Sequence, residues 1–142
     1  MPSGQPFRFE TRIRFIDTDA SGRIHYTAMF RYFESAEIEL LRIVGITYDL
    51  QRPYRFPRVH VECDFMRPIR HDDLIEIETS LRKLGRSSPR FEFSVVKSGD
   101  LCAKGLVIVA CIDPKTEQTM SIPDDVRARF ATILSDWDES RP

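Results

Sequence analysis

The sequence predicts an α+β domain in which a curved antiparallel sheet wraps around one long helix. Three observations lead to this fold class. A stripe of apolar residues at helical spacing covers residues 27–44, four strand-like segments follow it, and only short turns connect those segments. Short turns cannot hold the crossovers that parallel strands need, so the late strands are expected to be antiparallel. A sheet and a helix that bury their apolar faces against each other satisfy both patterns.

The first strand and the helix are marked by a change of period. Apolar and charged side chains alternate over residues 7–16, as expected for a half-buried strand. From residue 27 the apolar positions follow a helical period, and Met29 and Phe33 belong to one wide stripe. Gly45 is a typical stop signal, so the helix is expected to end near residue 44.

The rest of the chain is mostly strand and ends in a short helix. Apolar patterns predict strands at residues 58–65, 74–84, 90–97 and 101–112, and a helix at residues 121–134 with Pro123, Asp124 and Asp125 in its first turn. One strand, one long helix and then four strands is the order of the hotdog fold. No repeat or linker divides the sequence, so residues 1–142 are expected to form a single domain.

Composition excludes several classes of function. The chain has 142 residues and a net charge of −1, from 21 basic and 22 acidic residues, which gives no general attraction to nucleic acid. Its three cysteines show no CxxC spacing, so neither a disulfide framework nor a zinc site is expected. There is no signal peptide pattern and no apolar run long enough to span a bilayer. The expected location is the cytoplasm.

The loop at residues 17–26 carries the most chemical information. It holds Asp17, Asp19, Gly22, His25 and Tyr26 directly before the predicted helix. Thioester hydrolysis needs a carboxylate that attacks the carbonyl carbon or deprotonates a water, and donors for the developing oxyanion. Free backbone N–H groups at a helix N-terminus are such donors. On chemistry alone, an Asp-x-Asp pair before a helix is more often a turn and capping element than a catalytic one.

Residues 14–42, RFIDTDASGRIHYTAMFRYFESAEIELLR, resemble the signature of the 4-hydroxybenzoyl-CoA thioesterase family. They are similar both to the hydroxybenzoyl-CoA enzymes and to the thioesterases associated with the Tol-Pal system. The resemblance continues more loosely to Pro114. It implies a hotdog fold, hydrolysis of an acyl-CoA thioester without metal or organic cofactor, and a homodimer or homotetramer with sites at subunit interfaces.

The same resemblance implies roles for individual residues. Asp19 would be the catalytic carboxylate, as nucleophile or general base, and Tyr26 would give its backbone N–H to the thioester carbonyl. Asp17 would hold the loop. The order His25-Tyr26 is the reverse of the Tyr-His order usual in Tol-Pal-associated enzymes, so the histidine role of that subfamily does not transfer. His25 and Thr27 are expected to contact substrate.

A basic turn near residues 82–90 is the second candidate for substrate contact. The residues expected to hold the phosphates of CoA or to shape the pocket across a subunit boundary are Arg82, Lys83, Arg86, Ser87 and Ser88, with Arg90 beside them. A solvated hairpin tip explains the same pattern equally well.

Three alternatives remain open at this point. A second hotdog clade carries its carboxylate on the helix, where Glu34 or Glu37 would serve. A hotdog hydratase would need an Asp and a His five residues apart in a loop with Asn and Pro, whereas Asp19 and His25 are six apart and the segment contains neither. The third alternative is a non-enzymatic domain that binds acyl-CoA or an acyl carrier protein.

Overall fold

The structure is a computed structural model, and it describes residues 6–135. The elements follow one another as β1 (Phe7–Arg12), the 3-10 turn η1 (Phe15–Asp17), α1 (Ala28–Ile43), β2 (Arg58–Phe65), β3 (Leu74–Leu84), β4 (Pro89–Lys97), β5 (Asp100–Val109) and α2 (Asp124–Ala131). Within the described part of the chain, the strands form a five-stranded antiparallel sheet in the order β1-β3-β4-β5-β2. The prediction of an α+β hotdog fold is confirmed.

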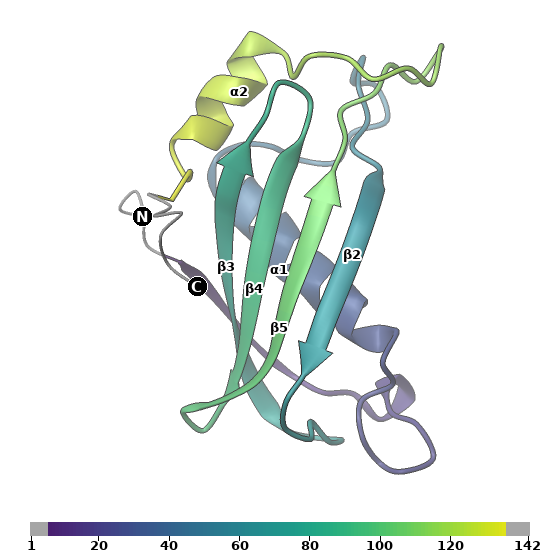
Figure 1. Cartoon of the computed structure of the whole chain (residues 1–142), viewed down its shortest axis with the longest axis vertical. Helices are drawn as coiled ribbons and strands as arrows, with labels where there is room; N and C mark the ends of the chain where they lie inside the picture. Colours follow the sequence, from purple (N-terminus) through teal and green to yellow (C-terminus); the bar gives the residue numbers. More distant parts are fainter. Residues whose placement is uncertain (1–5, 136–142) are drawn as a thin grey trace.

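Helix α1 crosses one face of the sheet and forms the centre of the core (Figure 1). The apolar stripe that predicted the helix is its buried side, and Phe33 is fully buried there. The Phe33 ring stacks on the Phe93 ring of β4 with centroids 4.5 Å apart. Gly105 of β5 lies under the same ring, and a Cβ there would be 2.2 Å from it. The absence of a side chain at Gly105 therefore lets the helix approach the sheet.

The prediction that the first strand continues to Ile16 is wrong. Strand β1 ends at Arg12, and Phe15 and Ile16 lie in η1 with exposed fractions of 75% and 83%. The strand ends early because the carboxylate of Asp17 accepts hydrogen bonds from the α1 side chains Arg31 and Tyr32. The chain has to turn before Asp17 to reach the helix, so the alternation stops being a guide to burial.

Strand β2 was predicted at the observed residues, but its apolar side is not covered. Val59 is 61% exposed and Val61 is 44% exposed. The reason is its position: among residues 6–135, β2 is an edge strand that pairs with β5 alone, with a register shift between Arg58 and His60. An edge strand leaves one row of backbone N–H and C=O groups without a neighbouring strand.

The last two predicted elements are shorter than expected. Strand β5 ends at Val109, and Ile112 forms isolated bridges with Arg55 and Thr119 instead. Helix α2 covers Asp124–Ala131, with its two aspartates in the first turn as predicted. It lies beside the end of β3 (Figure 1). No helix among residues 6–135 is both long and apolar enough to cross a membrane.

Candidate active site

The loop between β1 and α1 is fixed to the helix by Asp17. Its carboxylate accepts hydrogen bonds from the Tyr32 hydroxyl, at 2.7 Å, and from the Arg31 guanidinium. These two donors, with Tyr32 the stronger influence, lower the pKa of Asp17 despite the opposing effect of its burial. The backbone carbonyl of Asp17 accepts the N–H of His25 at 2.8 Å. Asp17 therefore connects the start of the loop both to α1 and to His25 at the end of the loop, in agreement with the structural role that the family resemblance implied.

Asp19 lies at the exposed tip of this loop with its carboxylate in an Asx-type turn. Its Oδ1 accepts the Ser21 hydroxyl at 2.6 Å and the Ser21 backbone N–H at 2.8 Å. These bonds, the hydroxyl first, lower the pKa of Asp19, and the nearby His25 acts in the same direction. Asp19 is therefore ionised at neutral pH, as a nucleophile or general base must be. Ser21 was not identified from the sequence, although a serine two residues after an aspartate is a signal for this turn.

The start of α1 supplies a free backbone donor at Tyr26. The N–H groups of the neighbours are engaged: His25 donates to Asp17, Thr27 to the His25 ring nitrogen Nδ1 at 3.2 Å, and Ala28 to the His25 carbonyl at 2.9 Å. The Tyr26 N–H makes no hydrogen bond to any residue in the described range 6–135. The Tyr26 ring is exposed and stacks on the His25 ring with centroids 4.8 Å apart.

Asp19 and Tyr26 line the same cavity, which has a volume of about 270 Å³. Its other walls come from the loop and from the end of β2, and the residues involved are Arg23, Ile24, Phe65, Met66, Arg67 and Pro68. The structure therefore brings together the two residues predicted to be catalytic. His25 and Thr27 are adjacent to them but do not line this cavity. The β2 contribution was not predicted, because no local pattern links residues 65–68 to the loop.

The basic turn between β3 and β4 lies at the opposite end of the sheet from the loop between β1 and α1, which carries Asp19 (Figure 1). Arg12, near the Asp19 loop, pairs with Leu74 at the start of β3, whereas the basic turn follows Leu84 at its end. A strand of 11 residues is about 35 Å long at roughly 3.3 Å per residue. Within one chain, this turn and Asp19 are therefore not brought together.

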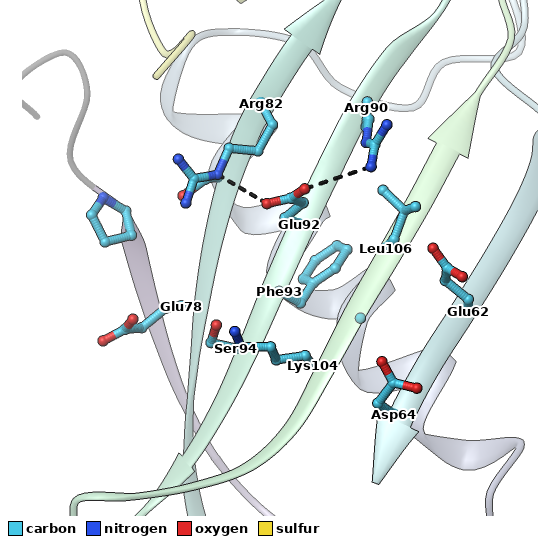
Figure 2. Close-up of a pocket in the computed structure, with 13 residues that line it drawn as sticks. Glu62, Asp64, Glu78, Arg82, Arg90, Glu92, Phe93, Ser94, Lys104 and Leu106 are labelled. Atoms are coloured by element: carbon cyan, nitrogen blue, oxygen red, sulfur yellow. Dashed lines mark ion pairs between the residues drawn. The ribbon is translucent and has the colours of Figure 1, made fainter. Parts of the chain in front are cut away.

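The side chains of the basic turn are partly engaged by other residues. Arg82 forms an ion pair with Glu92 at 3.1 Å, and Arg90 approaches the same carboxylate at 3.8 Å. Figure 2 shows both arginines reaching Glu92 across a hollow of about 440 Å³ on the face of the sheet away from α1. Lys83 is exposed and lines an adjoining hollow with Arg82 and Arg90. Arg86 donates to the Ser121 hydroxyl at 2.6 Å.

Ser87 and Ser88 shape the same turn through their backbones. The Ser87 carbonyl accepts the Cys111 N–H at 2.7 Å, and the Ser88 carbonyl accepts the Gly85 N–H at 2.9 Å. The first bond attaches the turn to the segment after β5, and the second closes the turn itself. The structure therefore gives both serines a local structural part in the turn.

The helix carboxylates considered from the sequence lie in a different environment. Glu37 is only 2% exposed, and its carboxylate binds the Arg58 guanidinium and the Tyr48 hydroxyl. Burial raises the pKa of Glu37 to about 7. Glu34 is exposed and approaches Arg58 at 3.8 Å. Neither glutamate lines the cavity of Asp19. Among residues 6–135, no group of three His, Cys, Asp or Glu side chains is placed to hold a metal ion.

Comparison with known proteins identifies the family. Residues 13–130 match the thioesterase-like superfamily. The chain is 27% identical over 127 residues to acyl-CoA thioesterase YbgC of Haemophilus influenzae, covering 87% of this chain and 93% of that protein. It is also 27% identical over 135 residues to 1,4-dihydroxy-2-naphthoyl-CoA hydrolase of Synechococcus elongatus, covering 92% and 93% of the two chains.

A solved structure agrees with both the sequence matches and the fold. A crystal structure of a protein from Aquifex aeolicus superimposes with a TM-score of 0.82 at 30% identity, covering 88% of this chain and 99% of that one. The family predicted from residues 14–42 is thereby confirmed. The chain belongs to the thioesterase-like superfamily and is a thioester hydrolase with the hotdog fold.

Proposed function

We propose that the protein hydrolyses an acyl-CoA thioester to a free acid and CoA, with Asp19 as the reacting carboxylate. The observation that carries this proposal is the shared cavity, which is lined by both Asp19 and Tyr26. The carboxylate of Asp19 is ionised, and the Tyr26 N–H has no hydrogen-bond partner among residues 6–135. The names of the relatives, an acyl-CoA thioesterase and a naphthoyl-CoA hydrolase, favour the same class of substrate.

The proposed chemistry assigns one task to each group. The Asp19 carboxylate either attacks the thioester carbon or removes a proton from the attacking water. The carbonyl oxygen becomes negative, and the Tyr26 N–H together with the positive end of the α1 dipole stabilises that charge. The C–S bond then breaks and the thiolate leaves as CoA. Water supplies the oxygen of the acid and the proton of the thiol. Where Asp19 itself attacks, this water cleaves the resulting anhydride between the acyl group and Asp19, which releases the acid and restores the carboxylate.

We further propose that the active form is a homodimer formed along β2, and that a tetramer would be built from such dimers. The open edge of β2 and its exposed Val59 and Val61 support this pairing. Two copies related by a two-fold axis would pair β2 antiparallel with its copy. The partner's basic turn, with Arg82, Lys83 and Arg86, would then lie at the same end as Asp19 and could hold the phosphates of CoA. The location in the cytoplasm and the absence of a cofactor stay predictions.

The dimer is tested by light scattering after size exclusion, comparing the native protein with Val61→Lys. A charge at this edge position should shift the mass toward the monomer, whereas an unchanged mass would contradict the β2 interface. The control is Val59→Thr, which keeps the shape and the strand preference.

The activity is tested by thiol release from short, long and aromatic acyl-CoAs. The native protein is compared with Asp19→Asn and with the matched control Asp72→Asn, which changes an exposed carboxylate outside the cavity. We expect turnover of one class of ester, loss of at least about a hundredfold in Asp19→Asn, and little change in the control. Binding of an ester without turnover by the native protein would favour the alternative of a binding domain.

A further inference from the structure

We propose that Arg23 and Arg67 form an anion subsite beside Asp19 that selects thioesters whose acyl group carries a negative charge. The favoured acyl groups would be those of dicarboxylic acids or of carboxylated aromatic acids. This inference rests on the proposed function, because it takes the Asp19 cavity as the place where the thioester carbonyl binds.

The wall of the cavity contains more basic than acidic residues. Three charged residues line the cavity, and two of them are arginines, Arg23 and Arg67, against the single acidic residue Asp19. The remaining lining residues, apart from Tyr26, are apolar, and they are Ile24, Phe65, Met66 and Pro68. An apolar cavity with two cations and one catalytic anion has a net positive charge. A ligand that brings one more negative charge balances it.

The backbones of both arginines are fixed by hydrogen bonds to neighbouring segments. Arg23 forms a bridge with Arg70, and its carbonyl accepts the Asp19 N–H at 2.8 Å. Arg67 follows the end of β2, and its N–H donates to the Cys102 carbonyl of β5 at 3.1 Å. The two arginines therefore belong to different segments of the wall, Arg23 to the catalytic loop and Arg67 to the segment that follows β2.

The guanidinium groups of Arg23 and Arg67 have few ion pairs that a ligand would have to replace. The carboxylate that pairs with Arg67 is that of Asp100, at 4.0 Å, and both side chains are more than 60% exposed. No ion pair among residues 6–135 uses the Arg23 guanidinium. By contrast, Arg82 and Arg90 share Glu92 in the hollow on the outer face of the sheet (Figure 2). Weak, exposed pairing contributes little to stability and is easily exchanged for a ligand.

The size of the cavity indicates which part of the substrate would supply the anion. The cavity measures about 270 Å³, which is small for a ligand site. The phosphates of CoA are separated from the sulfur by the whole pantetheine arm, so they would lie well outside a cavity that contains the carbonyl. The anion that meets Arg23 and Arg67 must lie within a few bonds of the carbonyl carbon. This condition fits a carboxylate on the acyl group.

The test compares esters that match in size and differ in charge. The pairs are glutaryl against valeryl and 4-carboxybenzoyl against 4-methylbenzoyl, each as the CoA ester and as the N-acetylcysteamine ester, which has no phosphate. The proteins are the native chain, Arg23→Gln, Arg67→Gln and the control Arg70→Gln. Arg70 neighbours Arg23 in the bridge but does not line the cavity.

We expect kcat/KM of the native protein to favour the anionic ester of each pair by at least about tenfold, about 1.4 kcal/mol, in both ester series. Each cavity variant should remove most of this preference, while Arg70→Gln keeps it. Equal rates for the charged and neutral esters would overturn the proposal. It is equally overturned when the variants slow all CoA esters alike and leave the N-acetylcysteamine esters unchanged, because the arginines would then serve the phosphates.

Binding measurements separate this inference from the proposed function. The non-hydrolysable thioethers 4-carboxybenzyl-CoA and 4-methylbenzyl-CoA are titrated into the same four proteins. Tighter binding of the carboxylated thioether, lost in Arg23→Gln and Arg67→Gln, supports the subsite even where no ester is hydrolysed. Equal binding of both thioethers by the native protein contradicts the subsite even where hydrolysis is observed.

Discussion

The buried carboxylate of Glu37 makes stability depend on pH in a direction unusual for a paired glutamate. Burial raises its pKa from 4.5 to about 7, which corresponds to about 3 kcal/mol at roughly 1.4 kcal/mol per pKa unit. A carboxyl whose pKa is raised on folding binds its proton more tightly in the folded state. Its contribution to stability is therefore fully present below pH 4.5 and is lost as the pH rises through about 7.

The perturbation that isolates this effect is Glu37→Gln, which keeps the shape and removes the titration. Urea unfolding of both proteins from pH 4.5 to pH 8 gives the difference in their free energies of unfolding at each pH. We expect this difference to move by about 3 kcal/mol in favour of the glutamine variant as the pH rises. For a chain of this size, that is a relative shift in Tm of roughly 10 °C.

The control for this experiment is Glu34→Gln, because Glu34 also approaches Arg58 but is exposed. Its difference from the native protein should be nearly independent of pH. The reasoning is refuted when the Glu37→Gln difference is flat, or when it moves in favour of the native protein as the pH rises. A flat difference would mean that Arg58 balances the effect of burial on the pKa of Glu37, and the opposite slope would mean that Arg58 outweighs it.

Two further predictions concern the core and the catalytic loop. Gly105→Ala should lower the free energy of unfolding by about 1–3 kcal/mol, because its Cβ would meet the Phe33 ring at 2.2 Å. Gly85→Ala, whose Cβ would lie 3.4 Å from its nearest neighbour, is the control, and equal stabilities would contradict the packing. Ser21→Ala removes the hydroxyl that lowers the pKa of Asp19, so the acidic limb of kcat/KM should move to higher pH. An unmoved limb would mean that Ser21 does not influence Asp19.

The sequence predicted best those elements whose own residue pattern shows which side is buried. The helical stripe around Phe33 predicted α1 and its buried face, because a wide apolar stripe has to be covered. The alternation in β3 and β4 predicted central strands for the same reason. The loop motif around Asp19 indicated the family, and the structure then placed Asp19 and Tyr26 in one cavity.

Features that depend on distant partners could not be predicted. Phe15 and Ile16 continue an alternating pattern, yet they are exposed because Asp17 binds side chains of α1 more than ten residues away. The exposure of Val61 follows from the place of β2 at the edge of the sheet, which strand propensity does not reveal. A glutamate at position 37, on the buried stripe, was a visible signal, but its partner Arg58 lies on β2.

The most direct test of the central claim separates binding from cleavage at Asp19. Asp19→Asn is titrated with the acyl-CoA that the native protein hydrolyses fastest, and bound ester and released thiol are followed in the same sample. We predict binding within about threefold of the native KM and thiol release slower by at least about a hundredfold, or about 3 kcal/mol of transition-state stabilisation. Cleavage at the native rate would contradict the assignment of Asp19 as the reacting carboxylate.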